Sequence, residues 1–232
     1  MTSNQLIYDP SIFDQASIES AKEIVLTPEN GISTQTRWDS ETPWLLNLIN
    51  KHLKPSGLIV DYGCGVGRLA GPLVNHGYPV IGIDTSSAMR QHATNLIANE
   101  RFVAMTPTML DQLVGIGVKA DCVLAVWILQ HCFDLDAEVE RIYKTLNKGG
   151  IVGIADMRHR AIPTNQGWRS DGKNVKETLS RFFTLIQQYP YSAPNAPQNL
   201  RDNAYVAFFQ KNRWVNHVKY AHTFIHTHFT RG

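Results

Sequence analysis

The chain has 232 residues, 43% of them apolar, with 22 basic and 20 acidic side chains. This composition suits one packed domain, and so small a net charge does not by itself indicate a nucleic-acid or membrane partner. Three cysteines without framework spacing indicate free thiols and a cytoplasmic protein, and we find neither a leader pattern nor an apolar run near the roughly 18 residues of a membrane span.

Residues 1–40 precede the segment with nucleotide-binding character, and we expect them to form an N-terminal cap or lid. Within them, residues 17–26 have the apolar spacing of a short helix, which the sequence TPENG ends. Such a helix either covers a cofactor cleft or pads the sheet at the surface, and both interpretations stay open. Thr42 followed by Pro43 then predicts the start of the next helix.

A strand, a glycine turn, a helix and a second strand follow one another before residue 84. Residues 58–60 are an apolar run that ends at Asp61, and residues 63–67 read GCGVG. Residues 79–83 form the second strand, and Asp84 closes it. This order of elements is typical of one half of a nucleotide-binding α/β unit.

The side chains around this turn indicate the kind of ligand. Gly63 and Gly65 let a ligand approach the backbone closely and tolerate a positive φ. Asp84 stands at the end of the second strand, where a carboxylate in nucleotide-binding units accepts hydrogen bonds from ribose hydroxyls. Asp61 would repel a pyrophosphate but attract an ammonium and a sulfonium, and Arg68 stands where the dinucleotide fingerprint has its third glycine. We therefore favour S-adenosylmethionine over NAD.

Alternating elements continue the α/β pattern beyond Asp84. We expect helices over residues 86–99, 109–114, 134–146 and 175–186, and strands over residues 101–104, 121–127, 151–155 and 204–209. The strand at 121–127 is nearly continuous in apolar residues, as a buried parallel strand requires. The sequence thus predicts a doubly wound, mostly parallel sheet in one cofactor-binding domain over 41–210. Residues 157–172 are expected to form a loop, and residues 211–232 a tail of unknown placement.

Four sequence motifs resemble those of the class I S-adenosylmethionine-dependent methyltransferase family. They are DYGCGVGR at residues 61–68, IDTS at 83–86, DCVL at 121–124 and LNKGG at 146–150. The resemblance extends from Leu58 to Asp156, about half of the chain. It implies a seven-stranded Rossmann-like methyltransferase sheet, an N-terminal helical cap and S-adenosylmethionine as the cofactor.

The resemblance also implies which residues touch the cofactor. Arg37 is a candidate for the carboxylate of the methionine moiety, with Trp38 beside it, and a surface arginine packed along a tryptophan is the alternative. Many relatives place an acid after the third strand to receive the adenine amino group, but this chain has Met105-Thr106 there, so the backbone or Thr106 must supply that contact. The expected cofactor contacts are Arg37, Trp38, Asp61, Gly63, Cys64, Gly65, Asp84, Thr85, Met89, Met105, Thr106, Val126, Trp127 and His131.

Two residues near strand ends are candidate catalytic groups. Methyl transfer from a sulfonium depends on positioning, and a base is needed only when the acceptor must lose a proton. His131 is a candidate base or cofactor contact, and Asp156 a candidate to orient an acceptor hydroxyl or amine. A packed histidine and a loop carboxylate are the alternatives. His222 and His226 have ligand-like spacing, but no acid or cysteine accompanies them, so we expect no metal site.

These observations favour a methyltransferase that acts on an oxygen or nitrogen of a small molecule. A protein or RNA acceptor is the first alternative, and a strongly basic face around the cleft would support it. A non-catalytic S-adenosylmethionine-binding module is the second alternative, and an NAD oxidoreductase is the third. We expect no membrane partner and no nucleic acid, and the sequence leaves the acceptor's identity and the oligomeric state open.

Overall fold

The structure is a computed structural model that describes residues 5–212. Its helices are η1 (Pro10–Phe13), α1 (Ile18–Val25), α2 (Thr34–Asn50), α3 (Ala70–Asn75), α4 (Ser87–Ile97), α5 (Pro107–Gly115), η2 (Leu129–His131), α6 (Leu135–Thr145), α7 (Val175–Ser180) and α8 (Gln198–Asn203). Its strands are β1 (Ile59–Tyr62), β2 (Val80–Ile83), β3 (Phe102–Met105), β4 (Ala120–Val126), β5 (Leu146–Met157), β6 (Ile162–Thr164), β7 (Gly167–Arg169), β8 (Phe183–Pro190) and β9 (Ala204–Lys211).

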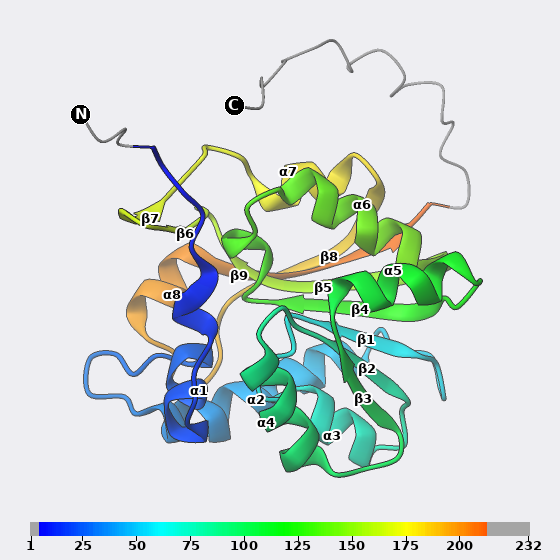
Figure 1. Cartoon of the computed structure of the whole chain (residues 1–232), viewed down its shortest axis with the longest axis horizontal. Helices are drawn as coiled ribbons and strands as arrows, with labels where there is room; N and C mark the ends of the chain where they lie inside the picture. The colour runs from blue at the N-terminus through cyan, green and yellow to red at the C-terminus, as the bar shows by residue number, and fades with distance from the viewer. Residues whose placement is uncertain (1–4, 213–232) are drawn as a thin grey trace.

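A seven-stranded sheet with the order β3-β2-β1-β4-β5-β9-β8 runs through the middle of the described chain (Figure 1). The first five strands of this order are parallel to their neighbours, and β9 is antiparallel to both β5 and β8. The expected doubly wound, mostly parallel sheet is therefore confirmed. The strand order reverses between β1 and β4, and ligands of such sheets bind outside the carboxyl ends of the strands at this point.

Two hydrophobic layers hold the helices against the sheet. Cys122 and Leu124 of β4 belong to the core that includes α2 and α3, whereas Val123 and Ala125 belong to the core that includes α5, α6 and α7. Successive side chains of a strand point to opposite faces, so β4 is apolar throughout because both of its faces are covered. Figure 1 shows these two helix layers on opposite sides of the sheet.

The helix expected to begin at Thr42 begins earlier, and Pro43 lies inside it. α2 begins after Ser33, whose Oγ accepts a hydrogen bond from the Thr36 backbone N–H (3.1 Å). Its first two turns bury Arg37 and Glu41 instead of apolar side chains, so the hydrophobic spacing could not reveal them. The boundary that we place between residues 40 and 41 thus lies inside one continuous helix.

The segment after β5 also differs from the expectation. Of the helix expected over residues 175–186, only α7 (Val175–Ser180) is helical, and Phe183 already begins β8. The apolar residues there satisfy both a helical and a strand period, and β8 is an edge strand that is mostly exposed. The expected loop over residues 157–172 contains the β6–β7 hairpin.

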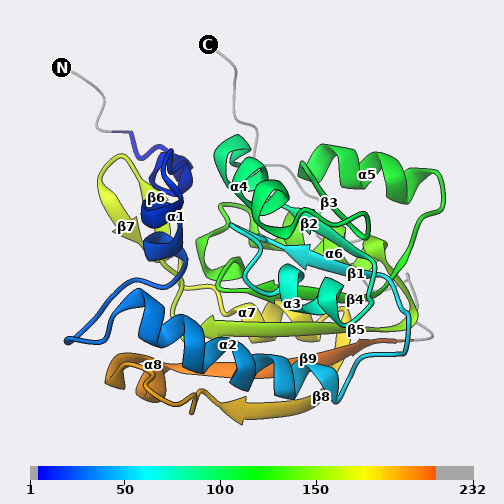
Figure 2. The ribbon, with the colours of Figure 1, turned by 90° about the horizontal axis from the view of Figure 1, so that it is seen from below.

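The N-terminal segment forms the expected helical cap at one end of the sheet. Before the cap helix α1, the chain runs along the β6–β7 hairpin, where Asp9 N donates to Pro163 O (3.1 Å) and Asn165 N donates to Ile7 O (3.0 Å). Ser86 at the start of α4 donates through Oγ to Asp14 (2.6 Å). Figures 1 and 2 show α1, β6 and β7 at the same end of the molecule.

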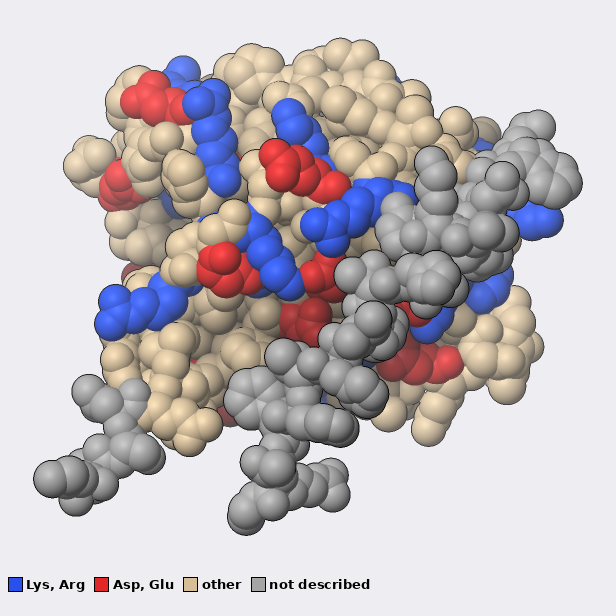
Figure 3. Space-filling view, turned by 90° about the horizontal axis from the view of Figure 1, so that it is seen from above, with Lys and Arg blue, Asp and Glu red and all other residues tan. Residues whose placement is uncertain are grey.

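The face that carries α6 and α7 mixes charges of both signs (Figure 3). Asp136 pairs with Lys173 (2.5 Å) and with Arg181 (2.9 Å), and Lys144 pairs with Glu140 (2.7 Å). No helix between residues 5 and 212 has both the length and the apolar character needed to cross a membrane. The expectations for the tail histidines His222 and His226 lie outside the described residues.

Truncation of a core residue in β4 should destabilise the whole domain. Leu124 is fully buried between the sheet and α2, so Leu124→Ala should lower the free energy of unfolding by about 2–5 kcal/mol. Ile116, which is 80% exposed, provides the control, and Ile116→Ala should change the stability by no more than about 0.5 kcal/mol. Urea unfolding followed by circular dichroism measures both, and equal effects would contradict the assigned core.

Candidate functional site

A cavity of about 310 Å³ lies at the carboxyl ends of β1, β2 and β4. Asp61 and Asp84 line it from β1 and from the end of β2, and Val126 and Trp127 line it from the end of β4. The cap contributes Phe13, Ile24, Val25, Thr27 and Glu29. The site therefore lies where the topology places a ligand, and the cap forms part of its wall.

The glycine turn allows close approach to the backbone from two sides. Gly63 has φ 75°, and a Cβ on it would lie 2.6 Å from Cγ1 of Ile128. Gly65 has φ 51°, and its Cβ would lie 3.0 Å from Cγ2 of Val25 in α1. Side chains at these positions would be strained in conformation and would collide with the walls of the pocket. The turn is thus shaped both for a ligand and for the cap helix above it.

Asp84 connects the end of β2 to the glycine turn. Its Oδ2 accepts a hydrogen bond from the Gly65 N–H (2.9 Å), and its Oδ1 accepts one from the Ser86 N–H (3.0 Å). Burial raises the pKa of this carboxyl, and these backbone hydrogen bonds act in the opposite direction. Asp84 lines the cavity, and each of its two oxygens already accepts one backbone hydrogen bond.

Asp61 is a second buried acid, at the end of the neighbouring strand. Its exposed fraction is 3%, and desolvation raises its pKa to about 7, although the Arg68 guanidinium and the Ala70 N–H oppose this shift. The negative charge of Asp84 raises the pKa further. A cationic ligand group beside Asp61 would therefore stabilise its ionised form.

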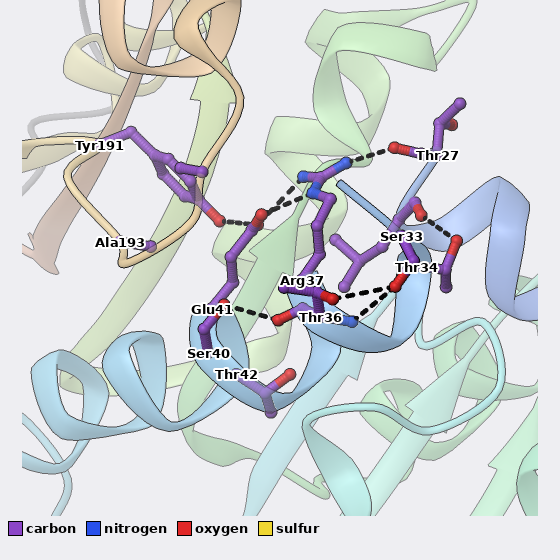
Figure 4. Close-up of polar contacts among 12 residues, drawn as sticks. Thr27, Ser33, Thr34, Thr36, Arg37, Ser40, Glu41, Thr42, Tyr191 and Ala193 are labelled. Atoms are coloured by element: carbon purple, nitrogen blue, oxygen red, sulfur yellow. Dashed lines mark hydrogen bonds and ion pairs between the residues drawn. The ribbon is translucent and has the colours of Figure 1, made fainter. Parts of the chain in front are cut away.

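Arg37 lines the cavity but is already engaged by other groups of the protein, as Figure 4 shows. Its Nε and Nη2 donate to the two carboxylate oxygens of Glu41 (2.5 and 3.0 Å), and its Nη1 donates to Thr27 O (2.8 Å). The Tyr191 hydroxyl donates to Glu41 Oε2 (2.6 Å). Trp38 lies outside the lining and packs with the hydrophobic cluster around Met89.

His131 has a defined orientation and tautomer. Gln130 Oε1 accepts from the Met157 N–H (3.0 Å), so the Gln130 amide nitrogen faces His131 Nε2 (2.9 Å) as a donor. His131 Nδ1–H therefore donates to Ala161 O (2.6 Å). Burial lowers the pKa of the ring, so His131 is neutral at pH 7.

Trp127 is held in a strained backbone conformation where β4 enters the pocket. Its φ is 61°, a value that bulky residues rarely adopt, and its N–H donates to Ala155 O (2.8 Å). The indole packs edge-on against Tyr191 with ring centroids 5.1 Å apart. Strain of this kind persists only where the surrounding packing enforces it, and it often occurs at functional sites.

Asp156 is fully buried in β5 and does not line the cavity. Its Oδ1 accepts from the Met157 N–H (2.9 Å), and its Oδ2 has no hydrogen-bond partner in the described part of the chain. Desolvation raises the pKa of Asp156 to about 8, against the smaller effects of the Met157 N–H and of Arg160. At neutral pH this carboxyl is therefore mostly protonated, and it has no access to a ligand in the pocket.

The structure brings most of the expected site residues together. Those that line the cavity are Arg37, Asp61, Gly63, Cys64, Gly65, Asp84, Met89, Val126, Trp127 and His131. Those outside the lining are Trp38, Thr85, Met105, Thr106 and Asp156. Thr106 caps α5, because its Oγ1 accepts from the Met109 N–H (3.2 Å).

Three polar residues at this site carried no assigned role in the sequence. Arg68 and Gln130 line the cavity, and Glu41 lies behind Arg37. The spacing of four residues between Arg37 and Glu41 is a usable signal for a helical ion pair. Contacts such as that of Glu41 with Tyr191, 150 positions later, leave no local pattern.

A family model described as a methyltransferase domain matches residues 60–154. Two similar solved structures contain the cofactor or its product. The N-methyltransferase NodS from Bradyrhizobium japonicum, with S-adenosyl-L-homocysteine, has a TM-score of 0.58 at 15% identity over 74% of this chain and 85% of that one. Magnesium protoporphyrin IX methyltransferase from Synechocystis, with bound S-adenosylmethionine, has a TM-score of 0.57 at 18% identity over 87% of this chain and 94% of that one.

Residues 60–154 therefore match a methyltransferase domain, and the chain has the fold of the S-adenosylmethionine-dependent methyltransferase family. The cofactor of this family is S-adenosylmethionine, and the pocket fits it: two acids suit a cationic ligand with a ribose, and side-chain-free backbone lies between them. Similar sequences include the ubiquinone biosynthesis O-methyltransferases of Bartonella bacilliformis, 31% identical over 118 residues, and of Chelativorans, 31% over 101 residues. These matches cover 49% and 42% of this chain, and 44% and 39% of the relatives, so the chain spans less than half of their length.

The buried acid Asp156 should make this methyltransferase less stable as the pH rises. Its pKa of about 8 in the folded chain exceeds the ordinary value of 3.8, so between those values the unfolded chain binds fewer protons and the folded state loses stability. Asp156→Asn removes this proton and keeps an oxygen acceptor for Met157 N. Urea unfolding at several pH values should show that the free energy of unfolding of the variant rises relative to that of the wild type from about pH 5 to pH 8. A constant difference would contradict the raised pKa.

Proposed function

We propose that this chain transfers the methyl group of S-adenosylmethionine to an oxygen or nitrogen of a small, uncharged molecule. The observation that carries the proposal is the pair of acids, the buried Asp61 and the half-buried Asp84, on either side of the glycine turn at the ends of adjacent strands. An oxygen acceptor is supported by the names of the curated relatives, which are O-methyltransferases.

Three pocket residues would hold different parts of the cofactor. Asp84 presents its carboxylate to the ribose hydroxyls, since it stands at the end of β2 and lines the cavity. Asp61 stabilises the cationic end of the molecule. Met89 supplies apolar contact from α4. When bound, the cofactor provides a methyl group on a positively charged sulfur, so the leaving group is already activated and the protein contributes mainly position and exclusion of water.

The acceptor side of the pocket, around His131, is apolar and aromatic. Phe13 from the cap and Trp168 from β7 both pack against the His131 ring, with centroids 5.3 Å away in each case. Met157 lines the cavity nearby. Next to His131, Gln130 lines the cavity with a neutral amide, and Arg160, whose charge helps to lower the pKa of His131, lies outside the lining. Such surroundings favour an acceptor without charge, because an unpaired ion would be desolvated there.

His131 is the group best placed to receive a proton from an acceptor hydroxyl. Its neutral state supplies one lone pair, on Nε2, and the Ala161 carbonyl fixes the ring through Nδ1–H. The Gln130 amide donates to this Nε2, so the amide must yield when the ring takes a proton. The pair thus holds the base in position until an acceptor arrives.

Loss of the Asp84 carboxylate should weaken cofactor binding. Each charge-assisted hydrogen bond to a ribose hydroxyl contributes about 1.5–3 kcal/mol, so Asp84→Ala should weaken the affinity for S-adenosylmethionine by about 10- to 100-fold. Thr85→Ala is the control, since the neighbouring Thr85 lies outside the cavity lining, and it should leave the affinity within about twofold. Isothermal titration calorimetry measures both. Unchanged binding in a folded Asp84→Ala variant would place the ribose elsewhere.

Replacement of His131 should reduce turnover without reducing cofactor affinity. If His131 accepts the proton, His131→Gln should lower kcat by about 10²- to 10⁴-fold, because general-base catalysis supplies that much. The assay follows S-adenosylhomocysteine release with a panel of phenols, alcohols and amines, and calorimetry confirms that the cofactor still binds. An unchanged kcat would leave His131 with only a packing role.

A further inference from the structure

Two buried arginines, Arg37 and Arg68, line the same part of the cofactor cavity. Arg37 is 5% exposed and Arg68 is 4% exposed, and Arg68 lies near both Arg37 and Asp61. Both can bind a carboxylate through a planar set of N–H donors. They differ in how many of those donors the protein already uses, and this difference indicates which arginine is free for a ligand.

Arg37 is neutralised by the protein itself. Thr27, Arg37, Glu41 and Tyr191 form a connected set, here called the clasp, in which each of the three Arg37 nitrogens has a partner (Figure 4). Glu41 is fully buried and binds the guanidinium through both of its oxygens. The clasp joins α2 to the segment after the cap helix and to the loop after β8. A ligand carboxylate at Arg37 would have to compete with Glu41.

Arg68 has far fewer partners. Its hydrogen bond to another described residue is the long one from Nη1 to Thr42 Oγ1 (3.3 Å), and no carboxylate oxygen within residues 5–212 forms an ion pair with it. Glu41 and Asp61 act on it only from a greater distance. A buried guanidinium without a paired anion is costly, and an anionic ligand group in the cavity would remove that cost.

Asp61 and Arg68 together match an amino-acid head group. They carry opposite charges and both line the cavity, yet they do not form an ion pair with each other. A ligand with an ammonium and a carboxylate on the same carbon can satisfy both residues at once. The methionine moiety of S-adenosylmethionine has this arrangement of charges.

We propose that Arg68 binds the methionine carboxylate of the cofactor, and that Arg37 is a positioning residue which acts through the clasp. This inference rests on the proposed function and deepens it. It also reassigns the role that the sequence had suggested for Arg37. In this arrangement Asp61 faces the ammonium group, and the clasp keeps Thr27 and the end of the cap helix against the pocket.

The test uses two ligands that differ in a single group. S-adenosylhomocysteine carries the carboxylate, and its decarboxylated analogue keeps the ammonium but lacks the carboxylate. In calorimetry on the full chain, Arg68→Met should weaken binding of S-adenosylhomocysteine by about tenfold or more and leave binding of the analogue within about twofold. Arg68→Lys, which keeps the charge, should restore part of the loss.

Arg37 and a surface arginine provide the comparison. Arg37→Met should weaken both ligands by the same factor, because the clasp acts on the pocket and not on the carboxylate. Arg101→Met, at an exposed position at the start of β3, should change neither. The inference is overturned if Arg37→Met shows the carboxylate-selective loss, or if Arg68→Met and Arg68→Lys weaken both ligands equally. Failure of the wild type to bind either ligand would instead overturn the proposed function.

Discussion

Two carboxylates, the buried Asp61 and the half-buried Asp84, lie at the ends of neighbouring parallel strands, and their desolvation is the main electrostatic cost of the pocket. Desolvation raises the pKa of each of them, and the charge of Asp84 adds to the effect on Asp61. Backbone N–H groups compensate Asp84, and Arg68 compensates Asp61 only in part. In the proposed complex, the cationic end of S-adenosylmethionine would complete the compensation at Asp61.

The two buried arginines, Arg37 and Arg68, differ in how the protein balances their positive charges. Arg37 belongs to a hydrogen-bonded set that joins segments 150 positions apart, and its charge is balanced within that set. Arg68 stands in the first turn after the glycines, and among residues 5–212 its guanidinium hydrogen-bonds only to Thr42, through Nη1. Buried networks of this kind specify one arrangement of the elements around them more than they add stability. The clasp therefore sets where the cap leaves α2, and the pocket follows from that geometry.

The central sheet and the glycine turn were predictable because their signals are local. Apolar strands, glycines at forced positions and an acid at each strand end follow one another within residues 58–84. The predicted start of α2 was wrong because the first turns of this helix bury Arg37 and Glu41, which do not contribute to a hydrophobic period. The helix predicted over residues 175–186 was wrong from residue 183 onward, because β8 is an edge strand with no buried face to impose alternation on residues 183–190. The different hydrogen-bond partners of Arg37 and Arg68 depend on contacts across the fold, and no spacing in the sequence predicts them.

The cap also determines how a molecule enters and leaves this pocket. Phe13, Val25 and Thr27 form part of the wall, and Val25 lies against the glycine turn. α1 itself buries only Ala21, so its docking depends on few contacts and can be released without disturbing the sheet. The wall of the pocket above the glycine turn therefore depends on the docking of one eight-residue helix, whereas the floor belongs to the sheet.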